Sequence, residues 1–131
     1  MKKTITTISL FFVFLYITSQ TTHTINAGSY YYNPSSLTID LGDSVVWIND
    51  GGFHDVNGNI NSITGQSFNN PVTFDSPPTN TVGAVIFSYK FTLVGTYDYD
   101  CSIGSHAANG MVGTVIVMDN STGLNESFNS I

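Results

Sequence analysis

The sequence contains a single cysteine, Cys101, in a chain of 131 residues. One cysteine excludes an internal disulfide, although small secreted domains usually use their cysteines in this way. A lone thiol in an oxidising compartment is vulnerable unless it is buried, bound to a metal or used in chemistry. Cys101 is therefore the first candidate for a functional residue in this chain.

Arginine is absent, and three lysines stand against nine acidic residues. A protein that binds nucleic acid needs clustered Lys and Arg to neutralise phosphates. This composition therefore excludes nucleic-acid partners and disfavours binding to anionic membrane surfaces. The acidic balance favours partner proteins that present basic docking patches.

The chain also lacks an apolar run long enough to cross a membrane comfortably. The stretch 5–17 is dominated by Ile, Leu, Phe and Val, but a transmembrane helix needs about 20 apolar residues. It follows Lys2 and Lys3 and leads into Thr, Ser and Gln, which is the order of a secretory signal peptide. We therefore expect residues 1–22 to be a signal peptide for a secreted or periplasmic protein, with an uncleaved membrane anchor as the alternative.

Beyond the signal, no segment has the pattern of a long helix. Short apolar runs alternate with Gly, Asn, Ser and Thr, which is typical of an all-β sandwich or barrel. The length suits one domain, which we expect over residues 23–119, followed by a flexible polar tail over residues 120–131. We expect this domain to be monomeric.

Individual strands are indicated by apolar residues at every second position. In the segment ending at Cys101, Tyr97 and Tyr99 should share the side of the thiol, and Asp100 should face solvent. The stretch 57–80 is dominated by Asn, Ser, Gly, Thr and Pro, and predicts a long surface excursion. The predicted strands cover residues 37–41, 45–48, 85–93, 97–101 and 111–117.

Four residues with soft or borderline donor atoms carry the chemistry. Cys101, His106 and Met111 lie in one loop between two predicted strands, with four residues between each and the next. His54 follows the strand 45–48, which a sandwich can bring beside that loop. Two imidazoles and a thiolate in one plane, with a weak axial thioether, make a type 1 copper site. The remaining histidine, His23, is expected to be a frayed surface residue.

Several segments that contain these residues resemble the plastocyanin branch of the cupredoxins, in the family's order and over roughly residues 24–118. The resemblance implies an eight-stranded Greek-key β-sandwich that holds one copper ion and transfers single electrons between redox partners. It implies His54, Cys101, His106 and Met111 as the copper ligands. The segments are 42–49, 54–56, 95–101, His106 and 110–115.

The resemblance also implies that electrons leave through the outer edge of His106, among small and apolar neighbours. This sequence differs from the family at two residues near the ligands. The family commonly has Asn where Asp55 stands, and plastocyanins carry Tyr where Asp100 stands. The expected surface around His106 consists of Phe53, Gly104, Ala107, Ala108 and Gly110.

Other functions require features that the sequence lacks. Multicopper oxidases and reductases need additional histidine clusters of the His-x-His kind, and this chain has none. Copper storage or delivery proteins usually carry exposed Met-rich or His-rich tracts, which are also missing. A zinc site built from Cys and two His is chemically possible, but Met111 favours copper. We therefore expect a non-enzymatic electron carrier, with copper storage or delivery as the alternative.

Overall fold

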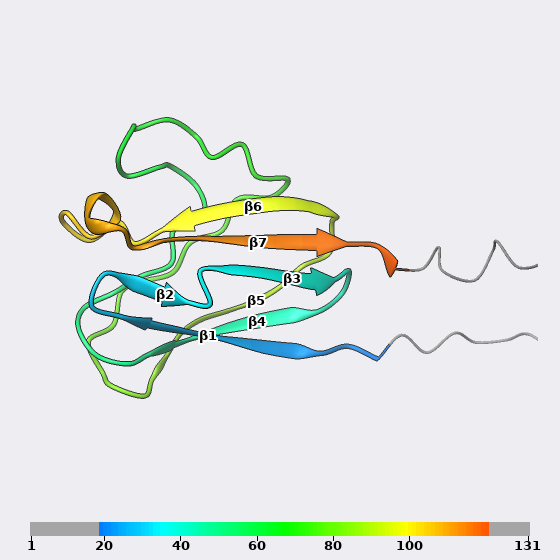
Figure 1. Cartoon of the computed structure of the whole chain (residues 1–131), viewed down its shortest axis with the longest axis horizontal. Helices are drawn as coiled ribbons and strands as arrows, with labels where there is room; N and C mark the ends of the chain where they lie inside the picture. The colour runs from blue at the N-terminus through cyan, green and yellow to red at the C-terminus, as the bar shows by residue number, and fades with distance from the viewer. Residues whose placement is uncertain (1–18, 121–131) are drawn as a thin grey trace, which may run out of the picture.

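The computed structural model describes residues 19–120, which form a sandwich of two β-sheets (Figure 1). One sheet has the strand order β2-β1-β4-β5, and the other has the order β3-β7-β6. The predicted all-β sandwich is thereby confirmed. The elements are β1 (Thr22–Gly28), β2 (Tyr31–Asn33), β3 (Ser36–Asp40), β4 (Ser44–Asn49), β5 (Val85–Lys90), β6 (Gly95–Asp100), the short 3₁₀ helix η1 (Ala107–Asn109) and β7 (Val112–Met118).

The described residues form seven strands, whereas the family resemblance implied eight. Between β4 and β5 the chain makes isolated β-bridges but no named strand. Three prolines in this stretch lack a backbone N–H, and its Asn and Ser side chains bond to nearby backbone groups, which competes with a regular ladder. The predicted excursion is confirmed, and it stays irregular along its length.

The core is aromatic and centres on Trp47. β4 lies between β1 and β5, so both of its edges are paired, and Val45 and Trp47 on its inner face are fully buried. The Trp47 ring lies 5.4 to 6.2 Å, centroid to centroid, from the rings of Phe74, Phe87 and Tyr99. Each such buried side chain contributes about 1.5–3 kcal/mol through the hydrophobic effect. A core with this many buried aromatic side chains does not need a metal to form, so we expect the apo-protein to fold.

The strand predicted over residues 85–93 is shorter in the structure. β5 begins at Val85 and ends at Lys90. Its first residue, Val85, is exposed, and so is Leu93, which follows the strand. β5 is an edge strand that pairs with β4 alone, and the register shifts beside Trp47. The aromatic face therefore reaches the core through Phe87, Tyr89 and Phe91.

The excursion covers the outer edge of β6, which would otherwise expose unpaired backbone groups. Asn57 exchanges both backbone hydrogen bonds with Asp100, at 2.9 Å each. The side-chain amide of Asn70 takes the place of a neighbouring strand, because it donates to the carbonyl of Asp98 and accepts from its amide, at 2.8 Å each. The segment before the cysteine is thus held from both sides.

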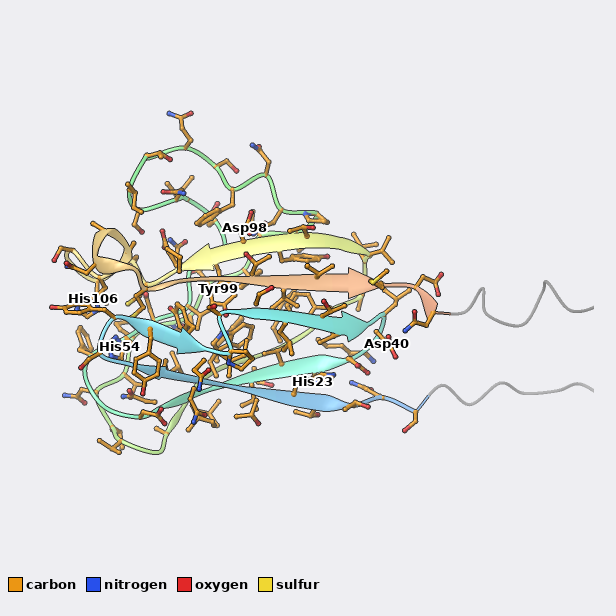
Figure 2. All side chains as sticks on the ribbon, viewed as in Figure 1. His23, Asp40, His54, Asp98, Tyr99 and His106 are labelled. Atoms are coloured by element: carbon orange, nitrogen blue, oxygen red, sulfur yellow. The ribbon has the colours of Figure 1, made fainter. Side chains whose placement is uncertain are left out.

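The expectation that His23 is frayed is wrong. His23 lies within β1, and its Nε2 is 2.8 Å from Oδ2 of Asp43, which follows the turn after β3. β1 runs parallel to β4, so its first residues are already paired with the sheet. Figure 2 shows His23 and Asp40 at the opposite end of the sandwich from His54 and His106.

The predicted signal peptide falls largely on residues 1–18, and the predicted tail largely on residues 121–131, both outside the described range. Within residues 19–120, no helix is long and apolar enough to cross a bilayer.

Candidate metal centre

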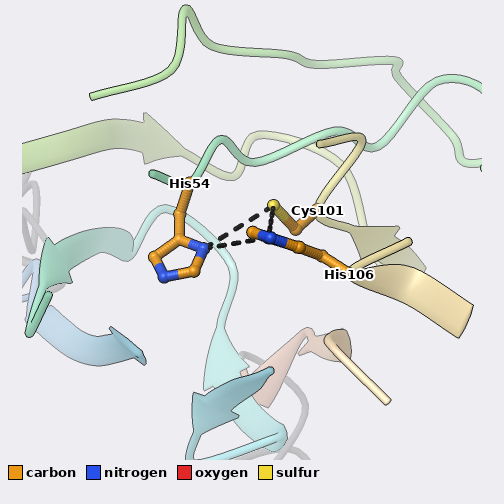
Figure 3. A group of neighbouring side chains, drawn as sticks. All are labelled: His54, Cys101 and His106. Carbon is orange, nitrogen blue, oxygen red and sulfur yellow. Dashed lines mark hydrogen bonds between the residues drawn. The ribbon is translucent and has the colours of Figure 1, made fainter. Parts of the chain in front are cut away.

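His54, Cys101 and His106 converge at one end of the sandwich (Figure 3). The Sγ atom of Cys101 lies 3.4 Å from Nδ1 of His106 and 3.9 Å from Nδ1 of His54. The two Nδ1 atoms are 3.3 Å apart. The centre of this triangle is about 2.1 Å from each corner, which is the length of a bond from a first-row metal to nitrogen or sulfur. The donor set and its spacing therefore fit a single metal ion.

A hydrogen bond at Nε2, the ring nitrogen that faces away from the other donors, fixes the orientation of His54. Its Nε2 lies 2.9 Å from the carbonyl oxygen of Gly51, which can only accept, so Nε2 carries the proton and Nδ1 keeps its lone pair. Burial lowers the pKa of His54 below its usual value, which favours the neutral form that binds metals. Gly52 is required here, because its φ is +100° and a Cβ would lie 2.5 Å from Nε2 of His54.

Cys101 follows β6 and is fully buried on the same side as Tyr97 and Tyr99, as predicted. Burial in this apolar environment raises the pKa of its thiol to about 11. The thiol is therefore protonated at neutral pH, and a metal ion must displace that proton to bind the sulfur.

Backbone hydrogen bonds fold the loop 101–111 back on itself and bring Met111 to the site. The amide of Met111 donates to the carbonyl of His106 at 3.0 Å, and the amide of Cys101 donates to the carbonyl of Met111 at 3.1 Å. Met111 is fully buried. The backbone of the fourth sequence-predicted residue is thus bonded to both other members of its loop, and its thioether is shielded from water.

The surface around His106 differs in one residue from the expected set. Gly104, Ala108 and Gly110 are exposed, and Phe53 is 47% exposed. Ala107 is buried, because η1 turns its side chain toward the interior. The prediction that Ala107 lies on the surface is therefore wrong. A pocket of about 220 Å³ opens on this side, lined by Ser29, Tyr30, Gly52, Phe53, His54, Ile103 and His106.

Asp55 links the two segments that carry the donors, and sequence reasoning did not identify this role. Its carboxylate accepts a hydrogen bond from the amide of Ser102 at 2.7 Å and a second from the Ser102 hydroxyl. Asp55 follows His54 and Ser102 follows Cys101, so the pair ties one donor segment to the other. The carbonyl of Asp55 also accepts from the hydroxyl of Tyr32 at 2.5 Å. The signal in the sequence was the departure from the family's Asn.

The prediction that Asp100 faces solvent is wrong. Asp100 is completely buried, and its carboxylate accepts from Nδ2 of Asn57 at 2.7 Å and from the amide and hydroxyl of Ser62 at 2.6 and 2.9 Å. Strand alternation does point this side chain away from Cys101. The excursion then folds over that outer face and covers it.

Tyr30 was also missed. Tyr31 lies at the sheet edge and Tyr32 in the core, but the ring of Tyr30 stands edge-on to the imidazole of His106, with a centroid distance of 5.2 Å and an interplanar angle of 81°. The backbone of Tyr30 has a φ of +61°. This left-handed conformation costs a residue with a Cβ about 1–2 kcal/mol.

The sequence matches the family of copper-binding proteins of the plastocyanin/azurin type over residues 19–118. It is 32% identical over 93 residues to plastocyanin from Scenedesmus fuscus, covering 70% of this chain and 91% of that protein. It is equally similar to the chloroplastic plastocyanin of Tetradesmus obliquus, of which it covers 61%.

Solved structures agree with these sequence matches. The purple cupredoxin from Nitrosopumilus maritimus aligns with a TM-score of 0.57 and 30% identity, over 73% of this chain and 99% of that one. The reduced Cu(I) form of the amicyanin P52G mutant aligns with a TM-score of 0.54 and 26% identity, over 73% and 81% of the two chains. With three donor atoms already at metal-binding distances, the chain belongs to the plastocyanin/azurin family of copper-binding proteins, and copper in a type 1 site is its cofactor.

Proposed function

We propose that the protein carries single electrons between redox partner proteins, through one copper ion bound by His54, Cys101, His106 and Met111. The observation that carries the proposal is the triangle formed by two Nδ1 atoms and one Sγ, with sides of 3.3 to 3.9 Å. Copper bound there supplies a one-electron couple. Imidazole binds both of its oxidation states, while thiolate and thioether favour the reduced one.

The protein holds the donor atoms in fixed positions and keeps water away from them. The His54 ring is held by the carbonyl of Gly51, and the loop 101–111 is closed by backbone hydrogen bonds. His54, Cys101 and Met111 are buried, so water does not reach them. Donors that keep their positions in both oxidation states require little rearrangement when an electron moves, which supports rapid transfer.

His106 is the donor that the surface exposes most, which supports it as the point where electrons enter and leave. Small exposed residues beside it, Ala108 and Gly110, let a partner approach closely. The acidic composition favours partners with basic patches.

We also propose that the protein is exported and that its signal is removed before Gln20, which is earlier than the boundary after residue 22 expected from the sequence. The side chain of Gln20 and the backbone of Thr21 already bond to the folded domain, through Ser44 and Asp43. N-terminal sequencing of the exported protein tests this. A mature N-terminus at or before Gln20 is expected, and one after Gln20 contradicts the proposal.

Absorption spectroscopy of the purified domain with one equivalent of Cu²⁺ tests the ligand set. We expect an intense visible thiolate-to-copper band, reversible one-electron voltammetry and rapid self-exchange. Cys101→Ser should abolish the band, while His23→Gln, a histidine change at the far end, should leave it intact. An unchanged band in Cys101→Ser contradicts the ligand set. Slow self-exchange with ready loss of copper to chelators would favour copper delivery instead.

A further inference from the structure

Tyr30 adopts a backbone conformation that normally belongs to glycine. It lies in the turn between β1 and β2, where Gly28 pairs with Tyr31, and its φ is +61°. Among residues 19–120, the other non-glycine residue with positive φ is Asn69, at +56°. Asn tolerates this region because its short side chain bonds locally, as Asn69 does to Ser67, whereas an aromatic residue has no such compensation. Something outside the turn must therefore favour the conformation of Tyr30.

The contact that this conformation creates is with His106. The Tyr30 ring meets the imidazole edge to face, at 5.2 Å and 81°. Aromatic pairs prefer this geometry, because the positive edge of one ring meets the negative face of the other. The backbone of Tyr30 also lies beside the donor loop, since a Cβ at Gly110 would come 3.9 Å from the Tyr30 carbonyl oxygen. Tyr31 and Tyr32, in contrast, bond to Asp50 and Asp55.

His106 needs support that His54 already has. The Nε2 of His54 is fixed by the Gly51 carbonyl, and that ring is buried. Within the described residues, the ring of His106 has no hydrogen bond from Nε2, and its partners lie on the Nδ1 side. Its outer edge faces the pocket of about 220 Å³, which Tyr30 lines. An imidazole held at one nitrogen can rotate, and the Tyr30 ring restricts that rotation.

We propose that Tyr30 is a positioning residue for His106, which holds the imidazole so that Nδ1 faces Cys101. The strained turn is retained because it directs the ring onto the donor at which electrons leave. This inference rests on the proposed function, and it extends the site to a residue that is not a ligand.

Two substitutions at Tyr30 and one at Asn69 distinguish a role of Tyr30 in positioning His106 from a role in stabilising the turn. Tyr30→Gly removes the ring and suits the backbone, so the apo-protein should melt at the same or a higher temperature. Withdrawal of Cu(I) by a chelator such as bathocuproine disulfonate should nevertheless become about twofold to tenfold faster, which corresponds to the loss of one edge-to-face pair. Tyr30→Phe keeps the ring and should behave like the wild type. Asn69→Gly makes the same backbone change in the excursion and should leave Cu(I) withdrawal unchanged.

Nuclear magnetic resonance of the apo-protein provides a readout that is independent of copper. Ring protons of His106 should show ring-current shifts and Overhauser contacts from Tyr30, and Tyr30→Gly should remove both. If copper fails to bind the wild type, the proposed function falls while this measurement still decides the Tyr30 contact. If Tyr30→Gly lowers the melting temperature and leaves Cu(I) withdrawal and the His106 resonances unchanged, Tyr30 serves the turn alone and the inference is overturned.

Discussion

The carboxylate of Asp55 lies 2.7 Å from the amide nitrogen of Ser102, and together with the bond from the Ser102 hydroxyl this contact joins the segment of His54 to that of Cys101. Asp55 is 6% exposed, so its negative charge is poorly screened by water. In the family an uncharged Asn commonly occupies this position. The substitution therefore keeps a hydrogen-bonded link and adds a charge beside the copper site.

Asp55→Asn should raise the reduction potential. The loss of a negative charge destabilises the more highly charged oxidised copper, by on the order of 1–2 kcal/mol or some tens of millivolts. Voltammetry of the copper protein measures this shift. Asp43→Asn removes another buried carboxylate, which bonds to His23 at the far end of the sandwich, and should leave the potential nearly unchanged. A potential that stays constant or falls in Asp55→Asn contradicts the prediction.

Met111→Gln should lower the reduction potential, because a harder oxygen donor favours the oxidised ion. The thioether is a weak axial donor in such sites, so copper affinity should change less than the potential. Met118→Gln is the matched control, since Met118 is exposed at the end of β7. Equal potentials for Met111→Gln and the wild type would show that Met111 is not an axial ligand.

Asp100→Asn should destabilise the fold rather than alter electron transfer directly. The carboxylate is surrounded by donors from Asn57 and Ser62, and an amide would turn its own NH₂ toward one of them. We expect a loss of about 2 kcal/mol in the free energy of unfolding of the apo-protein, measured in urea. Asp75→Asn changes an exposed carboxylate of the same excursion and should cost little. Equal unfolding midpoints for the two variants would refute the buried role of Asp100.

The apo-protein should lose stability in acid through Asp43. Burial opposes ionisation of this carboxyl, but hydrogen bonds from His23 and from the amides of Thr21 and Asp40 outweigh it and lower its pKa. A lowered pKa means that this stabilisation is complete above the pKa of an unfolded Asp, about 4, and is lost as the pH falls below that value.

Melting temperatures of wild type and Asp43→Asn, compared from neutral to acid pH, measure this effect. The difference between the two proteins should shrink below about pH 4. His23→Gln keeps the carboxylate and both backbone donors, so it should retain part of the acid sensitivity. A constant difference at every pH would exclude Asp43 as the source.

Ala108→Glu should slow electron self-exchange by about tenfold or more, because two copies would then meet with like charges beside His106. Added salt should restore part of the rate by screening. Leu93→Glu adds the same charge on an exposed residue just before β6, at the strand end remote from Cys101. Equal slowing by both variants would mean that electrons do not leave specifically at His106.

Features that depend on short stretches of chain were predictable from the sequence. The spacing of Cys101, His106 and Met111 confines three candidate donors to one loop, and alternation along β6 sets the side on which Cys101 lies. Both are local, because side chains in a strand alternate whatever the strand packs against. The aromatic core followed from the same rule, although β5 ends sooner than the pattern suggested.

The tertiary structure decided which residues each side chain contacts. Asp100 points outward as alternation requires, yet a segment some forty positions earlier in the chain covers it and supplies its donors. Tyr30 reaches His106 from the other sheet, and His23 pairs with Asp43 across two parallel strands. The sequence alone determined a copper-binding β-sandwich and its candidate donors, because those depend on residue types at close spacing. The contacts that hold the donors in place join distant segments, and only the folded chain brings those segments together.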